Sequence, residues 1–367
     1  MKKILALFLS VILVISCVGC SSGGEAASSN STGTNSDGSS QSASGTTDVS
    51  KFKSKKSKSQ WTIAVVTKDN TSPWFVRMAE GVNKYSKETG IKVIQKGPAN
   101  ADAASQVQVV KDLISQNVDA ICVVPIDPAA LEPTLKSAME KGIAVVTHEA
   151  SNQKNTLYDI EAFTPEHFGS VIMDNLANAM GKKGKYAVMV GYTTSTTHME
   201  YAKAQVNRQK SAYANMQLIN NGTIPSAQSE ESQDKAYERA KEILKANPDL
   251  TGFTGVASTD CPGIAKAVNE MGLAGKVKIV GVGTPNEFKP YIKSGKISTL
   301  LLWDPAAAGY AMCNMATKIL SGEKISDGVN LGADGWQNMK FVSGSTKDLT
   351  GNGELVITSK NIDQYNF

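Results

Sequence analysis

The strongest constraint on the fold is an alternation of short β-branched apolar runs with amphipathic segments of helical period, which extends over residues 61–283. The run WTIAVVT (61–67) precedes a segment in which Phe75, Met78 and Val82 recur three and four residues apart. Continuous apolar runs of this length are typical of buried strands, and apolar side chains at that spacing line one face of a helix. Repeated alternation of this kind predicts parallel sheets with helical crossovers.

The alternation falls into two series. In the first we expect strands at 61–67, 91–97, 120–125 and 143–148, with helices near 73–87, 104–116 and 129–141. In the second we expect strands at 158–163, 185–192, 252–258 and 276–283, with helices near 165–180, 198–215, 234–246 and 262–271. Roughly three hundred residues is more than one core usually holds. We therefore predict an α/β fold with two doubly wound parallel-sheet lobes.

Polar and aromatic side chains follow the expected strands, where ligands bind in open α/β sheets because loops and helix N-termini converge there. These side chains are Lys68, Asn70, Trp74 and Phe75 after the first strand, His148 and Glu149 after the fourth, and Thr197, His198, Ser258 and Asp260 after strands of the second series. Carboxylates, amides and hydroxyls hydrogen-bond to the hydroxyls of a sugar, and an aromatic face covers its C–H side. The pattern predicts a carbohydrate cleft.

Several of these residues also fit a purely structural role. Trp74 and Phe75 lie on the first turn of a helix and could belong to the core, and Asp260 could cap the helix that follows it. Lys68 could be a surface charge. The histidines at 148, 167 and 198 lack the close spacing of a zinc site, so we expect no metal and no cofactor.

The first twenty residues have the features of a lipoprotein export signal. Lys2 and Lys3 precede a short apolar run that ends in small residues and cysteine. We place cleavage and lipidation at Cys20, with Cys17 as the competing site and an uncleaved anchor as the alternative. This predicts an extracytoplasmic protein, lipid-anchored to the outer face of the cell membrane.

Residues 21–60 are poor in large apolar side chains and end in a lysine cluster. Such a composition predicts a disordered stalk. Residues 1–60 hold seven Lys against Glu25, Asp37 and Asp48, a net charge of +4, which equals the net charge of the whole chain. The remainder is neutral overall, so we interpret the lysines as lying beside anionic lipid and expect no nucleic-acid partner.

The remaining sequence carries no sign of a disulfide framework or of catalysis. After the first twenty residues there are three cysteines, Cys122, Cys261 and Cys313, and an odd number cannot all pair. Each lies in or beside an apolar stretch, where cysteine behaves as a small hydrophobe. There is no G-x-S-x-G, Walker A or close Cys-His motif, and GVGTPN (281–286) lacks the third glycine of a dinucleotide fingerprint. We expect a binding protein and not an enzyme, with a secreted α/β enzyme as the remote alternative.

Six blocks in order carry a resemblance to a known family. They are KDNTSPWFVRMAEGV (68–82), DAICVVPIDPAAL (119–131), KGIAVVTHEA (141–150), VKIVGVGTPNEFKPYIKSGKIS (277–298), LLWDPAAAGYAM (301–312) and NGELVITSKNIDQYNF (352–367). Together they resemble the type I periplasmic binding proteins, the solute receptors of sugar ABC importers, and most of all the branch of autoinducer-2 and rhamnose receptors.

The resemblance implies two discontinuous lobes joined by a three-stranded hinge. The chain would cross between lobes near 158–162, 302–304 and 337–340. The predicted N-terminal lobe holds 61–160 plus 304–338, and the predicted C-terminal lobe holds 161–303 plus 339–367. Trp303 would then lie at a hinge strand, where it either packs or touches ligand. The family also implies ABC permease subunits as partners, and we expect a monomer.

Carried over by position, the contacts of the autoinducer-2 receptors match only in part. Their lysine after the first strand is matched by Lys68, whereas Glu149 replaces an aspartate. Where the receptor pattern has Asp-Gln, this chain has Thr197 and His198. Where it has Pro and Ala, this chain has Val256 and Ser258. The aromatic pair of the pentose and hexose receptors is retained as Trp74 and Phe75. A polar cleft discriminates by leaving mismatched groups unpaired. We therefore favour a monosaccharide or related polyol, with autoinducer-2 as the alternative.

Overall fold

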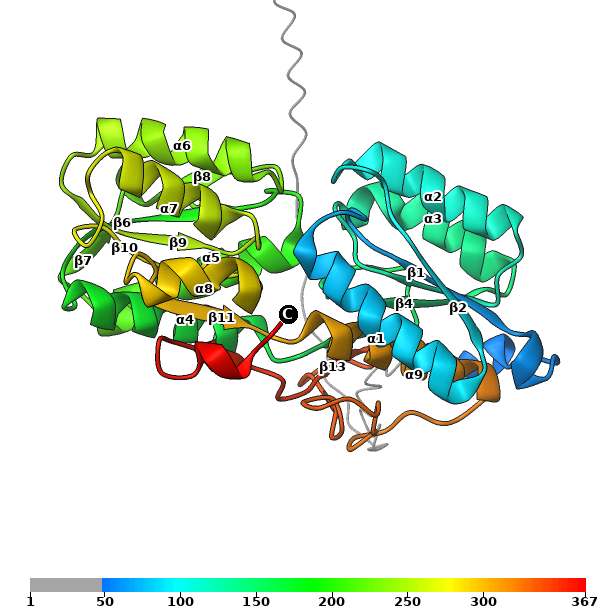
Figure 1. The fold of residues 1–367 in the computed structure, drawn as a ribbon. Helices are drawn as coiled ribbons and strands as arrows, with labels where there is room; N and C mark the ends of the chain where they lie inside the picture. Colours follow the sequence, from blue (N-terminus) through cyan, green and yellow to red (C-terminus); the bar gives the residue numbers. More distant parts are fainter. Residues whose placement is uncertain (1–47) are drawn as a thin grey trace, which may run out of the picture. The chain divides into compact units, whose positions relative to one another are not determined.

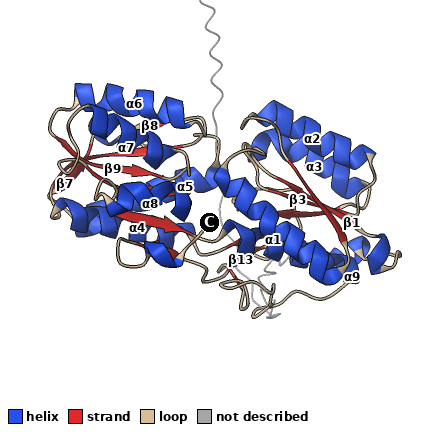
Figure 2. Cartoon of the chain, viewed as in Figure 1, coloured by secondary structure: helices blue, strands red, loops and turns tan. Residues whose placement is uncertain are grey.

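The computed structural model describes residues 48–367, which fold into two sheets flanked by helices (Figure 1, Figure 2). The expected signal segment 1–20, with Cys17 and Cys20, and the stalk residues 21–47 lie outside the described residues. No helix among the described residues is both long and apolar enough to cross a bilayer.

The first sheet, with its helices, forms what we call the N-terminal lobe. Its strand order is β12-β13-β5-β4-β3-β1-β2, and all pairs are parallel except β12 with β13. The strands are β1 Thr62–Val66, β2 Lys92–Lys96, β3 Ala120–Val123, β4 Ala144–Thr147, β5 Tyr158–Glu161, β12 Lys340–Phe341 and β13 Asp348–Thr350. Its helices are α1 Pro73–Thr89, α2 Ala103–Ser115, α3 Pro128–Glu140 and α9 Pro305–Ser321.

The second sheet forms the C-terminal lobe. Its order is β14-β11-β10-β9-β6-β7, with β8 pairing β6, and only β14 runs antiparallel to its neighbour. The strands are β6 Gly184–Val190, β7 Met216–Leu218, β8 Ala227–Gln228, β9 Leu250–Gly255, β10 Lys278–Val282, β11 Thr299–Leu302 and β14 Leu355–Ile357. Its helices are α4 Pro165–Met180, α5 Thr196–Ala212, α6 Gln233–Ala246, α7 Asp260–Glu270 and α8 Pro285–Lys293. The expected fold class, two doubly wound α/β lobes, is confirmed.

Each sheet is covered on both faces. In Figure 1, α1 and α9 cover one face of the first sheet and α2 and α3 the other, while α4 and α5 lie opposite α6 and α7 on the second. Local sequence sets where several helices begin, because α1, α3, α4, α8 and α9 each start with proline, whose fixed φ suits the first helical position. Helix α1 approaches α9 closely at Gly81, where a Cβ would lie 1.8 Å from the Ala306 carbonyl oxygen. Cys122, Cys261 and Cys313 are buried free thiols.

The chain passes between the lobes three times, after β5, after β11 and after β13. The first two crossings follow Glu161 and Leu302, and the ranges expected for them were 158–162 and 302–304. The third lies at 351–354 and not at 337–340, because 340–350 returns to the first sheet as β12 and β13. Residues 339–350 were therefore assigned to the wrong lobe. Strands of two and three residues are too short to show a period of two, so nothing in the sequence pattern marked them.

The last part of the expected stalk is ordered, which corrects the prediction for 48–60. This segment contains two short 3₁₀ helices, Val49–Phe52 and Lys58–Gln60. Phe52 is buried in the same core as α9, and the Ser54 N–H donates to the Leu320 carbonyl at 2.9 Å. Composition alone suggested disorder, but one aromatic anchor and backbone hydrogen bonds hold the segment against the N-terminal lobe.

Candidate functional site

A small cavity of ≈ 20 Å³ lies between the two lobes at the carboxyl ends of their strands. The N-terminal lobe contributes Lys68, Trp74, Phe75 and Glu149, and the second crossing contributes Trp303. The C-terminal lobe contributes His198, Glu231, Val256, Ala257, Ser258 and Val282. A cavity of this size holds about one water molecule. The surrounding side chains therefore fill most of the space between the lobes.

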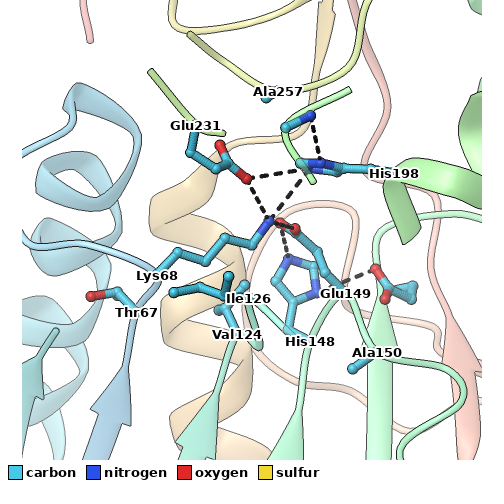
Figure 3. Close-up of polar contacts among 12 residues, drawn as sticks. Thr67, Lys68, Val124, Ile126, His148, Glu149, Ala150, His198, Glu231 and Ala257 are labelled. Atoms are coloured by element: carbon cyan, nitrogen blue, oxygen red, sulfur yellow. Dashed lines mark hydrogen bonds and ion pairs between the residues drawn. The ribbon is translucent and has the colours of Figure 1, made fainter. Parts of the chain in front are cut away.

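Lys68 is the centre of the site and contacts residues of both lobes (Figure 3). Its ammonium group lies 2.8 Å from Glu149 Oε2, 3.3 Å from Glu231 Oε1 and 3.4 Å from His198 Nε2. The Lys68 side chain is only 4% exposed, and those of Glu149 and Glu231 are 5% and 10% exposed. Buried charges are tolerated when they are paired in this way. The Lys68–Glu231 pair joins one lobe to the other.

Burial and pairing set the charges of this group. Burial alone would lower the pKa of Lys68, but Glu149 and Glu231 raise it above its ordinary value, so Lys68 is a cation. Burial, and next the charge of Lys68, lower the pKa of His198 well below its usual range, so that ring is neutral. Burial raises the pKa of Glu231, although Lys68 opposes the shift. One ammonium group therefore faces two carboxyl groups in this cluster.

The two glutamates are held on unusual backbone. Glu149 has φ of 62° and Glu231 has φ of 53°, both in the left-handed region that costs a non-glycine residue about 1–2 kcal/mol. Such residues concentrate at functional sites. At Gly191 a Cβ would lie 2.8 Å from the Glu231 carboxyl carbon and 2.9 Å from His198 Cε1, so a larger residue there would displace these two side chains. The local backbone is therefore shaped to bring these two side chains together.

His198 contributes its Nε2 atom to the cleft. The Gly191 N–H donates to His198 Nδ1 at 3.3 Å, while the Lys68 ammonium, also a donor, lies 3.4 Å from Nε2. A neutral ring accepts at only one of its two nitrogens, so these two contacts compete for the tautomer. His198 Nε2 also lies 3.8 Å from Glu231 Oε1. The site therefore combines an ammonium donor, carboxylate acceptors and an imidazole whose role depends on its tautomer.

Aromatic rings form the apolar part of the site. Trp74 and Trp303 meet edge to face with ring centroids 4.9 Å apart, and Trp303 also contacts Phe163 and Phe168. Trp303 thus both packs at the hinge and lines the cavity. Trp74 and Phe75 are 4% and 5% exposed, so each is largely core while one part borders the cavity.

His148 lies directly behind the cavity. The Trp303 indole N–H donates to His148 Nε2 at 3.1 Å, and His148 Nδ1 lies 2.7 Å from the Ile160 carbonyl oxygen. Burial disfavours the charged ring, but the nearby Glu161 carboxylate outweighs it and raises the pKa of His148 to about 9. Because an indole N–H only donates, protonation at Nε2 would break the Trp303 contact. The Trp303 contact requires an unprotonated Nε2 and so opposes the rise in the pKa of His148 that Glu161 causes. His148 therefore orients Trp303 and does not face the cavity.

Three further predicted residues lie away from the cavity. Asn70 donates to the Gly97 carbonyl and is exposed, and Thr197 is buried at the start of α5. Asp260 is fully buried and accepts hydrogen bonds from the Val256 and Ala257 N–H groups at 3.0 and 2.9 Å and from the Ser229 hydroxyl at 2.5 Å. It holds the loop that carries Ser258, so its role is to position the cavity wall.

Sequence reasoning missed Glu231 and Gly191. Glu231 follows β8, a strand of two residues, so no apolar run marked the end of a strand there. Gly191 follows β6, which was expected, but a glycine after a strand has no distinctive chemistry. One signal was available: Glu230 and Glu231 form an acidic pair in a turn-rich stretch, SAQSEESQ (226–233).

Two more hydrogen bonds join the lobes beside the cavity. The Tyr192 hydroxyl of the C-terminal lobe donates to the Ala101 carbonyl at 2.7 Å. The Ser151 hydroxyl of the N-terminal lobe lies 3.2 Å from Glu200 Oε1 on α5. Burial raises the pKa of Glu200 to about 7. Together with Lys68–Glu231, these contacts hold the cleft closed.

Comparison with known proteins gives one family. Residues 63–324 match the family described as periplasmic binding protein domain. The ribose import binding protein RbsB of Bacillus subtilis is 24% identical over 73% of this chain and 84% of its own length. A D-ribose/D-allose-binding protein of Pseudomonas aeruginosa is 27% identical over 71% of this chain and 82% of its own length.

Solved structures agree on the fold. LsrB from Clostridium saccharobutylicum in complex with AI-2 aligns with a TM-score of 0.77 and 25% identity, covering 83% of this chain and all of that one. A solute-binding protein from Clostridium phytofermentas with bound L-rhamnose aligns with a TM-score of 0.75 and 22% identity, covering 83% of this chain and 98% of that one.

Proposed function

The chain belongs to the periplasmic binding protein family, and from that premise we propose that it captures a monosaccharide or related polyol between its lobes and delivers it to an ABC importer. One observation carries the proposal. A cation, two carboxylates, a neutral imidazole and three aromatic rings from both lobes and a hinge crossing border one buried cavity. Paired polar groups beside aromatic faces are the chemistry that a sugar ring requires.

Each group has a defined use toward a polyol. The carboxylates of Glu149 and Glu231 accept hydrogen bonds from the hydroxyls of the ligand. The ammonium group of Lys68 donates hydrogen bonds to the oxygens of those hydroxyls. The imidazole of His198 adds a donor or an acceptor, depending on its tautomer. The indole and phenyl rings of Trp74 and Phe75 cover the C–H face of the sugar. Because one ammonium group faces two carboxyl groups, the cleft favours a neutral polyol over an anionic sugar.

Ligand entry requires the lobes to separate. The cavity of ≈ 20 Å³ is far smaller than a monosaccharide, and the Lys68–Glu231 pair spans it. Hinge motion at the three crossings opens such clefts. In the bound state, ligand hydroxyls take over the hydrogen bonds that Lys68 and Glu231 make with each other, so little pairing is lost when the sugar is enclosed.

The second candidate ligand is autoinducer-2. It is favoured by the structural likeness to LsrB in complex with AI-2 and by Lys68, which matches the lysine of that pattern. Against it stand Glu149, Thr197, His198, Val256 and Ser258, which all depart from the pattern. The ribose, allose and xylitol named for curated relatives support a sugar or polyol.

The proposal includes location and anchoring. We place the protein outside the cytoplasm, monomeric, and held to the membrane by lipid on Cys20, with Cys17 as the alternative. Replacing Cys20 with alanine should abolish metabolic labelling by a fatty acid and release the protein. Labelling that persists in this variant and disappears in the Cys17→Ala variant would transfer lipidation to Cys17.

The direct test is a thermal-shift screen of the purified protein with neutral monosaccharides and polyols, and with autoinducer-2. A ligand at about a hundred times its dissociation constant adds about 2.7 kcal/mol of stability, which is a readily measured shift in Tm. The recovered ligand should be chemically unchanged, whereas the remote alternative, a secreted α/β enzyme, would convert it. No shift with any sugar or polyol would refute the proposed ligand class.

A further inference from the structure

A group of exposed lysines lies at the amino ends of the strands of the N-terminal lobe. They come from the segment before β1 and from the turn after α3: Lys51, Lys53, Lys55, Lys56, Lys58 and Lys141. We call these six residues the lysine collar. In Figure 1 the segment that carries five of them is the blue stretch below the start of β1. None of them takes part in the sugar site.

The collar is held in place by packing. Phe52 and Trp61 are buried at either end of the lysine-rich stretch, at 9% and 3% exposure. The Trp61 indole N–H donates to the Lys56 carbonyl at 3.2 Å, and the Ser54 N–H donates to the Leu320 carbonyl at 2.9 Å. The ammonium groups are therefore displayed from a fixed surface, which lowers the entropy cost of binding a partner there.

The positive charge of the collar is largely uncompensated. Lys56 pairs with Asp119 at 2.7 Å, but Lys51, Lys53, Lys55, Lys58 and Lys141 make no ion pair with any residue of 48–367. A concavity of ≈ 240 Å³ is bordered by Lys51, Lys53, Lys56 and Lys141, and its one carboxylate is Asp119. Like charges this close persist because water screens them, and a multivalent anionic surface would neutralise them.

The collar and the sugar cleft lie at opposite ends of the same strands. Asp119 and Lys141, at the concavity, precede β3 and β4, whereas Lys68 and Glu149, at the cleft, follow β1 and β4. A surface that binds the collar would therefore leave the cleft, at the other end of the strands, open to the medium.

We propose that the lysine collar docks the N-terminal lobe onto a membrane surface rich in anionic lipid headgroups. Each lysine near such a surface adds attraction that falls off within a Debye length. An extended anionic plane suits six ammonium groups spread around a shallow concavity better than one small anion does. The inference is independent of which solute the cleft binds.

The test is cosedimentation with lipid vesicles. The protein begins at Ser21, which removes the apolar stretch and keeps residues 44–367, the compact unit that contains both sheets. We expect binding to vesicles of phosphatidylcholine with 30% phosphatidylglycerol, at ~50 mM salt, and at least tenfold weaker binding at ~200 mM. Binding to phosphatidylcholine alone should be at least tenfold weaker. The quadruple variant Lys51→Gln, Lys53→Gln, Lys55→Gln, Lys58→Gln should lose at least tenfold in affinity for the anionic vesicles.

A matched variant replaces four exposed lysines of the C-terminal lobe, Lys182, Lys183, Lys245 and Lys276, with glutamine. It carries the same loss of charge and should bind anionic vesicles like the parent protein. Both variants should melt as the parent does, because the substituted side chains lie outside the core. Equal binding to both vesicle types, equal loss in both variants, or no binding to anionic vesicles would overturn the proposal. Binding to duplex DNA but not to anionic vesicles would overturn it as well, and would reassign the collar to nucleic acid.

Discussion

The two walls of the cleft differ in how they are built. In the N-terminal wall, Lys68 and Glu149 lie two residues beyond β1 and β4, and Trp74 lies on the first turn of α1. The C-terminal wall depends on loops: Glu231 follows a two-residue strand, and Val256–Ser258 is held by Asp260 from behind. The N-terminal wall, apart from Glu149, therefore carries the features shared with sugar receptors, and the C-terminal wall carries the other departures at the cavity, His198, Val256 and Ser258. We infer that the first supplies general sugar chemistry and the second sets which ligand is bound.

Lys68→Met should give the largest effect, because it removes the one cation from the N-terminal wall. Glu149 and Glu231 would face each other without a counterion, and breaking a buried ion pair costs about 3–5 kcal/mol. We expect a large fall in the free energy of unfolding and loss of detectable sugar binding. Lys56→Met is the matched control, because Lys56 is also paired, with Asp119 at 2.7 Å, but is 49% exposed. It should cost about 1 kcal/mol or less. Similar losses in both variants would contradict a special role for Lys68.

Loss of an aromatic ring from the N-terminal wall should give the second largest effect. Trp74→Ala or Phe75→Ala should weaken binding of the identified sugar by about 2–4 kcal/mol, since the ring that covers the sugar is lost. Calorimetry gives the affinity, and denaturant unfolding gives the separate loss from a largely buried ring. Unchanged affinity in both alanine variants would show that these rings serve the core alone.

Glu231→Gln addresses the C-terminal wall. It keeps the size of the side chain and removes the charge that joins the lobes through Lys68, so affinity should fall by roughly ten- to hundredfold, as for loss of a charged hydrogen bond. The ranking of sugars should change as well, because this wall sets the ligand. Its neighbour offers the control: Glu230 pairs with Lys235 at the surface, and Glu230→Gln should bind normally. A Glu231 variant with unaltered affinity and ranking would remove the distinction between the two walls.

Sequence predicts the two walls unequally well, for a physical reason. Lys68 follows an apolar strand of five residues and Glu149 follows one of four, so the pattern located the strand ends and the residues after them. Glu231, the third crossing and the ordered segment 48–60 depend on elements of two to four residues, which are fixed by backbone pairing and by single anchors such as Phe52. The sequence pattern also does not show in which direction a side chain points. Asp260 and His148 follow expected strands, yet both point behind the cavity and support it.

The smallest effect should come from the hydrogen bond between Ser151 and Glu200 at the edge of the cleft. Burial raises the pKa of Glu200 to about 7, so the folded state favours the protonated acid. The contribution of the Glu200 carboxyl to stability is complete below the pKa of this side chain in the unfolded protein, about 4.3. That contribution is lost as the pH rises through about 7. Glu200→Gln stays neutral and should flatten the dependence of Tm on pH between about 5 and 8. A slope equal to that of the parent would assign the dependence to other groups.

The central claim is that the cleft binds a monosaccharide in preference to autoinducer-2. Calorimetric titration of the ligand-free protein, with neutral monosaccharides and separately with autoinducer-2, tests this claim most directly. Four of the five departures, Glu149, His198, Val256 and Ser258, line the cleft and arrange donors and acceptors for another hydroxyl pattern. Each buried group left unpaired costs about 1–3 kcal/mol. Two mismatches amount to roughly a hundredfold in affinity. The account predicts a monosaccharide bound near or below micromolar concentration and autoinducer-2 bound at least a hundredfold more weakly. Tight binding of autoinducer-2 with no binding of any monosaccharide would contradict it.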